Sequence, residues 1–466
     1  MIFSTYSFIF LFLPLVFISY SLALNSGRIL LAKYLLIGAS FFFYAYGSGD
    51  FFPWFVISVF FNYFIGVGLG KSQGEALVQR KKLLLALGLM GNIALLGYYK
   101  YTDFLIFNAN LLFDAELPYK NIILPIGISF FTFQLIAFLV DSYKGETKEY
   151  SLVNYLMFIT FFPQLIVGPI VHHKDVVPQY AGLVKSSPDT KKIAQGLFLF
   201  SLGCAKKLLM ADPLTSWAQP AFEHAQDLNQ VESWFASISF TLSYYFDLSG
   251  YADMAIGLGL MFGIALPINF NSPYKARNFA EYWRRWHMTL SNFLGTYIFR
   301  NVYDKSKGSR NFYWALFVTF FVSGFWHGAG WTFVVWGVVN GLFVISSHMM
   351  TRAGVALPFL VAWVMTFAGV VGTRVLFVAN DFADATHVLR TLFDFSTPAQ
   401  LANGYVATLQ PVYIIVGMLL VLCFPNSNQI VARFKPNAYF MLATAALLTA
   451  SLLNMSYVRG FLYFQF

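Results

Sequence analysis

The sequence contains few charged residues and few cysteines for its length. Asp, Glu, Lys and Arg make up 11% of its 466 residues, whereas ordinary soluble domains carry about 25%. The two cysteines, Cys204 and Cys423, lie in apolar surroundings without a group of His or Cys residues nearby. Two such thiols indicate neither a disulfide framework nor a metal site, so we expect no bound metal.

Hydrophobic residues make up 58% of the chain and gather in long segments. Because a helix needs about 20 apolar residues to cross a bilayer, the sequence predicts an all-α polytopic membrane protein with about 11 to 13 transmembrane helices and additional re-entrant or interfacial helices. The expected spans are 7–24, 29–46, 51–70, 83–100, 121–140, 151–171, 231–246, 251–268, 312–327, 331–349, 355–378, 410–424 and 437–455.

The polar stretches between these spans are too short for independent domains, and no internal repeat is present. We therefore expect one membrane domain over residues 1–466. The first residues lack the basic flank and the cleavage site of a secretory signal, so the first span should be a retained helix.

Lys and Arg occur mainly in short loops, which accounts for the formal net charge of +9 without a nucleic-acid partner. Arg28 and Lys33 follow the first span, residues 47–50 contain no base, and residues 71–82 contain four. The positive-inside rule then places the N-terminus outside the cytoplasm and residues 71–82 inside it.

Proline and glycine interrupt two of the expected spans, at residues 124–127, 162–164 and 167–169. Broken backbone at membrane depth survives only inside the protein or beside a water-filled cavity, so these segments indicate either an interior tunnel or packing kinks. Polar side chains within spans favour a polar path over lipid contact. They are Gln134, Asn154, Gln164, Tyr244, Tyr245, Asp247 and Ser249.

The segment 271–310 is the richest in charge, with eight Lys or Arg residues against Glu281 and Asp304. It lies between apolar spans, which suits a cytoplasmic loop with interfacial helices that binds a phosphate-bearing ligand or anionic membrane lipids. A plain orientation signal would give the same composition.

One histidine lies in a long stretch without charge. Between Arg310 and Arg352 no Asp, Glu, Lys or Arg occurs, and His327 lies close to the point where two spans must reverse direction. An imidazole beside Trp326 and the small residues 328–330 should stay neutral and able to accept a proton, with room for a ligand. We expect His327 to be catalytic, and a structural histidine that donates to a backbone carbonyl is the alternative.

A second histidine, His287, lies within the aromatic and basic residues 281–291. On a continuous helix Trp283 and His287 would share one face, with Trp286 close by, which suits a gate or a binding wall. An amphipathic interfacial helix is the stronger explanation when this segment is taken alone.

The remaining histidines carry no predicted role. His172 and His173 would point in different directions on a helix, and His224, His348 and His387 have no ligand partners at metal spacing. The chain also contains no Gly-Asp-Ser sequence, so covalent serine catalysis by this chain alone is not expected.

Several longer motifs occur along residues 1–345. They lie at residues 1–4, 124–134, 161–170, 245–255, 269–274, 283–291 and 324–328, the last of which reads Gly-Phe-Trp-His-Gly. With these motifs the chain resembles the membrane-bound O-acyltransferase (MBOAT) superfamily, and within it the bacterial alginate O-acetylation (AlgI-like) membrane proteins, with a family-like core over about residues 120–345.

The resemblance implies a ring of tilted helices around a tunnel across the bacterial inner membrane, with His327 at its constriction and His287 nearby. It implies acetyl-CoA as the acyl donor, no permanently bound cofactor, and a polysaccharide acceptor such as alginate, reached with an extracytoplasmic serine-type acetyltransferase partner. Besides the two catalytic candidates, we expect these residues to bind substrate: Arg284, Arg285, Trp286, Trp326, Tyr245, Asp247, Ser249 and Gln134.

Other functions stay open at this point. A more distant branch of the same superfamily transfers D-alanine from a carrier protein to teichoic acid. Broken helices and intramembrane polar residues also occur in transporters, although transporters usually contain internal repeats and this sequence shows none. The sequence does not distinguish general-base catalysis by His327 from a transient acyl-histidine.

Overall fold

The computed structural model describes residues 1–71, 77–147, 151–183, 189–396, 406, 408–455, 460 and 462. Within these residues the secondary structure is helical, and no β-strand occurs. The chain divides into two compact units: unit 1 comprises Met1–Phe200 and Met254–Pro267, and unit 2 comprises Ser201–Asp253 and Ile268–Phe466. That both units serve one functional domain over residues 1–466 stays a prediction.

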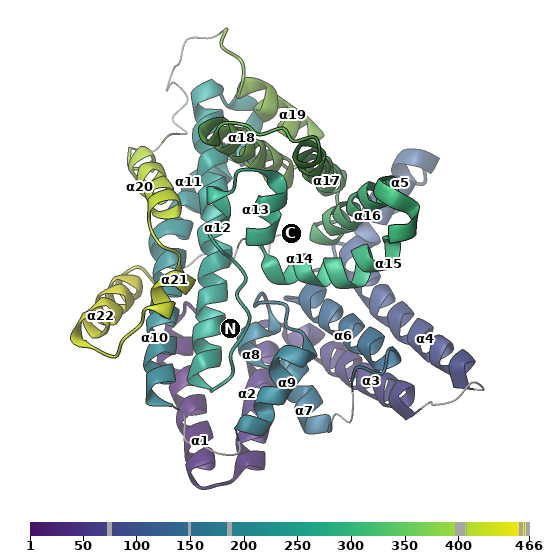
Figure 1. Ribbon diagram of the computed structural model, residues 1–466, viewed down its shortest axis with the longest axis vertical. Helices are drawn as coiled ribbons and strands as arrows, with labels where there is room; N and C mark the ends of the chain where they lie inside the picture. The colour runs from purple at the N-terminus through teal and green to yellow at the C-terminus, as the bar shows by residue number, and fades with distance from the viewer. Residues whose placement is uncertain are drawn as a thin grey trace. The chain divides into compact units, whose positions relative to one another are not determined.

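Unit 1 is centred on α6, which is buried along most of its length and packs against α3 and α4 (Figure 1). Its other close pairs include α1 with α2, and α2 with α7. The helices are α1 (Leu13–Asn25), α2 (Ile29–Gly47), α3 (Phe52–Lys71), α4 (Val78–Leu96), α5 (Thr102–Phe113), α6 (Ile128–Tyr143), α7 (Leu152–Thr160), α8 (Phe162–Leu165), α9 (His173–Gly182) and most of α10 (Thr190–Ala205).

Unit 2 is built around α17, which packs along α16, α18 and α13. The helices are α11 (Asp212–Glu223), most of α12 (Gln230–Met261), α13 (Phe279–Arg285), α14 (Met288–Leu294), α15 (Arg300–Val302), α16 (Gly308–His327), α17 (Trp331–Arg352), α18 (Phe359–Val378), α19 (Phe382–Thr391), α20 (Gln410–Cys423), α21 (Ser427–Ala432) and α22 (Ala438–Leu453).

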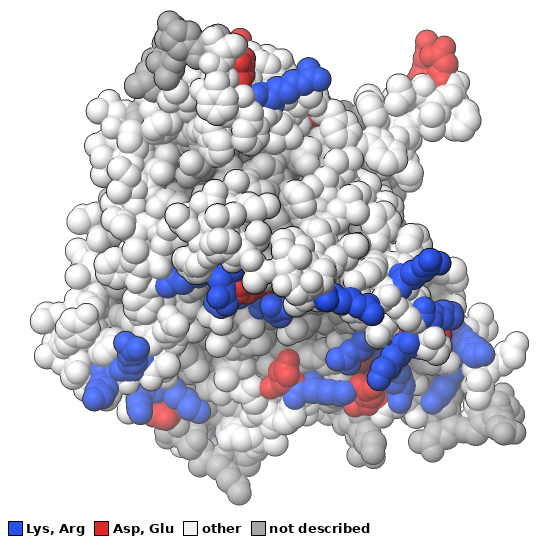
Figure 2. Space-filling view, turned by 45° about the horizontal axis from the view of Figure 1, so that its top comes forward, with Lys and Arg blue, Asp and Glu red and all other residues white. Residues whose placement is uncertain are grey.

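The prediction of an all-α polytopic membrane protein is confirmed. Seven helical stretches among the described residues are long and apolar enough to cross a membrane: Ser7–Asn25, Ile29–Gly47, Gly49–Gly70, Val78–Phe113, Thr190–Glu223, Trp331–Arg352 and Phe359–Val378. The shorter helices α6, α20 and α22 are also apolar. Figure 2 shows wide areas of surface without charged side chains, as a protein surrounded by lipid requires.

Two boundaries differ from the sequence-based expectation. The stretch Thr190–Glu223 was not among the expected spans, because it contains charged residues; Lys206 and Lys207 form ion pairs within unit 2 instead of facing lipid. The expected spans 231–246 and 251–268 are parts of the single long helix α12 as far as Met261. Gly250 lies within this helix and permits close packing, since a Cβ there would come within 2.8 Å of the Gly203 carbonyl oxygen.

The expected interruptions of unit 1 are present. Helix α7 ends before Phe161, whose ψ of 110° breaks the helical path, and residues 161–171 are buried although only α8 among them is helical. Gly127 has a φ of +76°, and a Cβ there would lie 3.1 Å from the Cα of Ile166. Glycine is therefore required at this close approach. That these segments line a tunnel stays a prediction.

Candidate active site

His327 is the last residue of α16, and its side chain is only 3% exposed. The chain then turns and returns as α17, so the expected reversal close to this histidine is confirmed. The two helices pack closely because small residues face each other: a Cβ on Gly324 would lie 2.9 Å from the Cα of Gly337. This close packing fixes the position of the imidazole.

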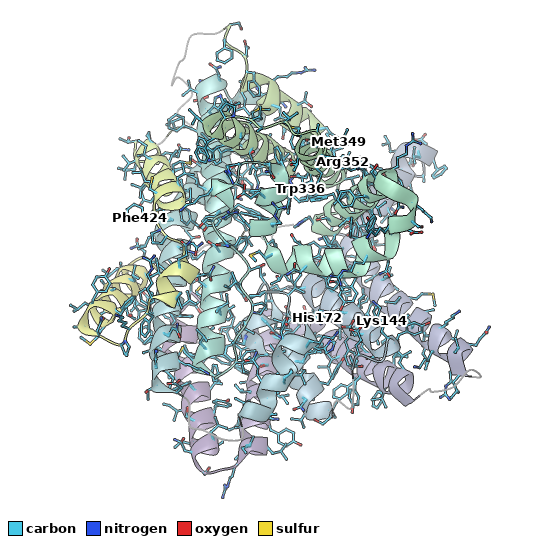
Figure 3. The ribbon with its side chains drawn as sticks, in the orientation of Figure 1. Lys144, His172, Trp336, Met349, Arg352 and Phe424 are labelled. Carbon is cyan, nitrogen blue, oxygen red and sulfur yellow. The ribbon has the colours of Figure 1, made fainter. Side chains whose placement is uncertain are left out.

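Aromatic rings surround the imidazole of His327. The ring centres of Trp326 and Trp336 each lie 4.9 Å from it, and that of Phe377 on α18 lies 5.5 Å away. Trp336, labelled in Figure 3, also lies 5.4 Å from Phe377. The surroundings of the imidazole are therefore largely apolar.

The small residues after His327 do not leave the expected space for a ligand. The side chain of Phe333 packs against Gly328, where a Cβ would lie 2.2 Å from the ring. The same ring lies 5.1 Å from that of Phe377. The expectation of open space here is wrong, because the glycine admits an aromatic side chain from the next helix.

His287 lies in a break between α13 and α14, with a left-handed φ of 44°. Trp286 before it is extended, so the continuous helix expected over residues 281–291 is wrong. Hydrogen bonds from Asn269 stabilise the break: its carbonyl accepts from the N–H of Met288 at 2.9 Å, and its Oδ1 accepts from the hydroxyl of Thr289 at 2.9 Å. Such backbone conformations store strain and often occur at functional sites.

Burial sets the charge of His287, which is 2% exposed. His287 does not lie in a membrane-spanning helix, because the flanking helices α13 and α14 have seven residues each and are too short to cross a membrane. Burial, with a smaller contribution from the positive charge of Arg374, lowers the pKa of His287 from 6.5 to about 3. The imidazole is therefore neutral at physiological pH.

The two histidines lie beside one aromatic cluster of unit 2. We define this cluster by its rings, Trp283, Trp286, Trp336, Phe377, Tyr244 and Tyr282. Trp336 connects His327 to Trp283, whose ring centre lies 5.7 Å away. Trp286, next to His287, stacks on Tyr244 and Tyr282 at 5.7 Å each. The predicted roles of Trp286 and Trp326 thus fall on residues that surround the histidines.

A cavity of about 510 Å³ lies between α13, α14, α16 and α17. Its walls include Trp283 and Arg284 of α13, Ser323 of α16 and His348 of α17, and the remaining lining is mainly apolar. Ser323 is four residues, one helical turn, before His327. Small-molecule sites commonly have volumes of about 300–1,000 Å³, so this cavity is large enough for part of a substrate.

The two predicted basic residues of α13 differ in their contacts. Arg284 is exposed and lines the cavity. Arg285 instead donates to the carboxylate of Glu281 at 2.8 Å and to the carbonyl of Asn271 at 3.3 Å. Arg284 is therefore the better placed of the two for an anionic group in the cavity.

Asp247 is fully buried on α12 and takes part in an ion-pair network. Its Oδ1 accepts from Lys207 Nζ at 2.7 Å, and its Oδ2 accepts from the N–H of Leu462 at 2.9 Å. Lys207 also pairs with Asp212 at 2.8 Å. These contacts favour a structural role for Asp247, although its predicted role in substrate binding stays a prediction.

Ser249 and Tyr245, the other predicted residues of α12, lie beside Lys206. Lys206 Nζ donates to Asp253 at 2.6 Å and to the hydroxyl of Ser249 at 3.4 Å, and it lies 5.9 Å from the ring centre of Tyr245. The ring of Tyr245 also lies 6.3 Å from that of Trp286. Tyr245 therefore connects the ion pairs with the aromatic cluster.

Gln134, the last predicted residue, belongs to α6 of unit 1 and is 2% exposed. Its side-chain oxygen is buried and has no hydrogen-bond partner among the described residues. A buried amide oxygen without a donor is unusual, and a substrate could supply one. The contact of Gln134 with substrate stays a prediction.

Sequence reasoning missed several residues of this site, including Trp336, Asn340, Phe377 and Arg374. Asn340 accepts a hydrogen bond from Trp283 Nε1 at 3.3 Å and thereby joins α17 to α13. A signal for one of them was present: Arg374 is the single charged residue of the expected span 355–378. Ionisable residues within spans are functional candidates by default.

Unit 1 brings together Asp141, His172 and His173, a group that could hold a metal ion. The expectation that the two histidines diverge is wrong, because His172 precedes α9 in an extended conformation. Asp141 Oδ2 lies 3.1 Å from Nδ1 of His173 and 3.4 Å from Nε2 of His172. Two imidazoles and a carboxylate are ligands that Zn²⁺ accepts, although the same atoms also contact one another within the protein.

Comparison with known sequences agrees with the family resemblance of the motifs. A sequence model of MBOAT, the membrane-bound O-acyltransferase family, matches residues 50–379, which include both buried histidines of unit 2. The chain belongs to this family. The predicted enzyme class, an O-acyltransferase, is thereby confirmed.

The chain is similar in sequence to several individual acyltransferases. The chain is 40% identical over 420 residues to the peptidoglycan O-acetyltransferase of Helicobacter pylori, with 84% of this chain and 79% of that protein covered. It is 34% identical over 429 residues to the probable alginate O-acetylase AlgI of Pseudomonas aeruginosa, with 89% and 81% covered. It is 28% identical over 240 residues to the teichoic acid D-alanyltransferase of Streptococcus thermophilus, with 49% and 57% covered.

Proposed function

We propose that this acyltransferase moves an acetyl group from acetyl-CoA to an acceptor hydroxyl, for O-acetylation of a polysaccharide outside the cytoplasm. The observation that carries the proposal is the position of His327. It is a buried imidazole at the end of α16, one turn after Ser323, which lines the cavity of unit 2. A thioester in this cavity would extend toward a base that is able to take a proton.

The cavity suits the two halves of acetyl-CoA. Arg284 at its wall can form charge-assisted hydrogen bonds with a phosphate, and the apolar lining suits the pantetheine arm. Acetyl-CoA would enter from the cytoplasm as a substrate, and no permanently bound cofactor is required. A tunnel through the membrane would then connect this donor site to the acceptor.

His327 can act in two ways. As a general base it takes the proton of the acceptor hydroxyl while the hydroxyl oxygen attacks the acetyl carbon and forms the new C–O bond. The C–S bond then breaks, and the CoA thiolate takes the proton from the imidazolium. As a nucleophile the imidazole itself would carry the acetyl group briefly before the acceptor attacks. The neutral His287 would line or gate the path of the acyl group.

The acceptor is suggested by the names of the relatives. Peptidoglycan is the first acceptor to test, because the relative named for it is 40% identical, and alginate is the second. Since the chain has no Gly-Asp-Ser sequence, an extracytoplasmic serine-type acetyltransferase would pass the acetyl group to the polymer. We propose accordingly that the chain lies in a bacterial inner membrane with its N-terminus outside.

D-alanyl transfer from a carrier protein to teichoic acid is the second candidate. The teichoic acid D-alanyltransferase noted above shows sequence similarity over about half of this chain, which supports the idea less strongly. Both reactions start from a thioester and would use the same base. The identity of the donor therefore separates them.

A donor assay tests the proposal. Membrane vesicles from cells that contain this protein and its serine-type partner are incubated with acetyl-labelled CoA or with D-alanyl carrier protein, and with fragments of peptidoglycan, alginate or teichoic acid, which are then analysed for label. We expect transfer from acetyl-CoA that is lost in His327→Gln and retained in His224→Gln, a control at an exposed histidine. Transfer from the D-alanyl carrier alone would contradict the proposal and support the second candidate.

A further inference from the structure

Arg374 is a buried cation of unit 2 that has no carboxylate partner among the described residues. It lies on α18, its side chain is 3% exposed, and it forms no ion pair with any described Asp or Glu. A buried charge is costly unless an opposite charge or several hydrogen bonds stabilise it. Its persistence at this position therefore requires a reason.

The aromatic cluster supplies part of that stabilisation. The guanidinium carbon of Arg374 lies 4.5 Å from the ring centre of Tyr244 and 4.4 Å from that of Trp286. One guanidinium nitrogen donates to the hydroxyl of Tyr282 at 3.0 Å. Ring faces attract a cation through their electron density, but they carry no net negative charge. The site is thus built to hold the guanidinium in place without neutralising it.

One N–H of Arg374 has no acceptor in the part of the chain that the structure describes. Its Nε is buried and without a hydrogen-bond partner among the described residues, although a guanidinium has five N–H groups to place. A buried donor left in this state is unfavourable unless another molecule accepts from it. The missing partner has the character of an anion, because it would face a positive charge in a site of low water content.

The location of Arg374 indicates which anion this is. Phe377, one turn later on α18, lies 5.6 Å from the guanidinium and 5.5 Å from the imidazole of His327. Trp286, stacked under the guanidinium, directly precedes His287, whose pKa the positive charge of Arg374 helps to lower. The unpaired cation therefore belongs to the same cluster as both histidines, whereas the exposed Arg284 lies at the cavity wall.

We propose that Arg374 is a catalytic residue of this acyltransferase whose guanidinium pairs with the negative oxygen that forms on the acyl carbonyl during transfer. This inference rests on the proposed function and adds to it the residue that stabilises the oxyanion. When the nucleophile forms its bond to the carbonyl carbon, the π electron pair of the C=O bond moves to the oxygen. When the C=O bond re-forms, the C–S bond breaks and the thiolate leaves with the proton held by the imidazolium.

An anionic phosphate of the donor is the other ligand with the same chemistry, and kinetics distinguish the two. An oxyanion exists only in the transition state and the intermediate, so its partner affects kcat and leaves the KM for acetyl-CoA unchanged. A phosphate is present in the bound donor, so its partner affects KM. We expect Arg374→Met, which fills the volume and removes the charge, to lower kcat by about 10²–10³-fold without a rise in KM.

Two further variants separate catalysis from packing. Arg374→Lys keeps the charge and should retain more activity than Arg374→Met. Arg374→Ala should regain activity as guanidinium chloride is added at low concentration, since the small cation can occupy the space left by the side chain, and a merely structural arginine would not show this rescue. Arg390→Met, at an exposed position of α19, is the matched control and should behave as the wild type.

The outcomes are distinct. A normal kcat in Arg374→Met would overturn the inference, and so would a rise in KM alone, which would assign the residue to the donor phosphate. Loss of activity with lower thermal stability and without rescue would leave only a structural role, which also overturns it. If the wild type does not use acetyl-CoA, the proposed function fails separately, and the same variants are measured with D-alanyl carrier protein, whose carbonyl passes through the same oxyanion.

Discussion

The two buried histidines of unit 2 lie in different backbone conformations. His327 ends a long helix, whereas His287 lies in a left-handed turn between two short ones. A helix end positions an imidazole rigidly, and a turn that is fixed by hydrogen bonds to Asn269 does the same at the cost of strain. Both conformations hold the imidazole in a fixed position, as the proposed roles of a base and of a wall residue require.

His287 makes the stability of the folded chain depend on pH. Its folded pKa is about 3 and its unfolded pKa about 6.5, so between these values the unfolded chain binds a proton that the folded chain does not. The free energy of unfolding therefore falls as pH drops through this window, by up to about 1.4 kcal/mol per pH unit from this group. Above this window the group has no effect.

Thermal unfolding of the purified protein measures this effect. Between about pH 7 and about pH 5, the wild type should lose more stability than His287→Gln, which cannot take up the proton. Equal losses in the two proteins would show that the fold does not lower the pKa of His287.

Arg284 should act on donor binding. Arg284→Ala removes a charge-assisted hydrogen bond worth about 1.5–3 kcal/mol, so the KM for acetyl-CoA should rise about tenfold or more with little change in thermal stability. Arg285→Ala should also weaken donor use, together with some loss of stability because the Glu281 ion pair is removed. Arg310→Ala, at an exposed position outside the cavity lining, serves as the control. An unchanged KM in both variants would remove them from the donor site.

Buried ion pairs allow charged residues to lie within an otherwise apolar helical stretch. Residues 206–211 form a π-helical turn between α10 and α11, and its Lys207 pairs with Asp247 and Asp212. The wider turn directs Lys206 and Lys207 to separate carboxylates, Asp253 and Asp247. Without these ion pairs, the charged side chains of the apolar stretch Thr190–Glu223 would lie unpaired at membrane depth, which is costly.

Asp247→Asn tests whether this network is structural. Because removal of one partner from a buried ion pair costs about 3–5 kcal/mol, we expect less folded protein and a lower unfolding temperature. Asp114→Asn, at an exposed carboxylate of unit 1, should change neither. If Asp247 binds substrate, as the sequence suggests, the variant would instead fold normally and show a raised KM.

The sequence alone singled out His327, because this histidine lies within a long stretch without Asp, Glu, Lys or Arg and close to the expected reversal of the chain. It also located the breaks around Gly127 and Phe161, where proline and glycine mark them. It did not predict the contact of Trp283 with Trp336, since pairing between distant segments has no local signature. The continuity of α12 was missed for a similar reason: Gly250 serves close packing against Gly203, which only the neighbouring segment reveals.

The orientation of the whole molecule in its membrane is a separate prediction from the base counts of its loops. The N-terminus should lie outside and residues 71–82 inside, of which 72–76 lie outside the described residues. In a background without Cys204 and Cys423, a cysteine at Ser72 should react with a membrane-impermeant reagent only after the cells are opened. A cysteine at Ser48 should react in intact cells. Labelling of position 72 from outside would contradict this topology and indicate the opposite orientation.

We expect the activity of the whole molecule to depend most directly on His327, which should be indispensable for chemistry and dispensable for folding. Glutamine keeps similar volume and some hydrogen bonding but cannot act as the base, so His327→Gln should insert normally and transfer acetyl groups about 10²–10⁴-fold more slowly. His287→Gln should lose less activity. The measurement is the rate of acetyl transfer at matched membrane levels of each variant. A rate near the wild type for His327→Gln, with His287→Gln inactive, would contradict the assignment of the two histidines.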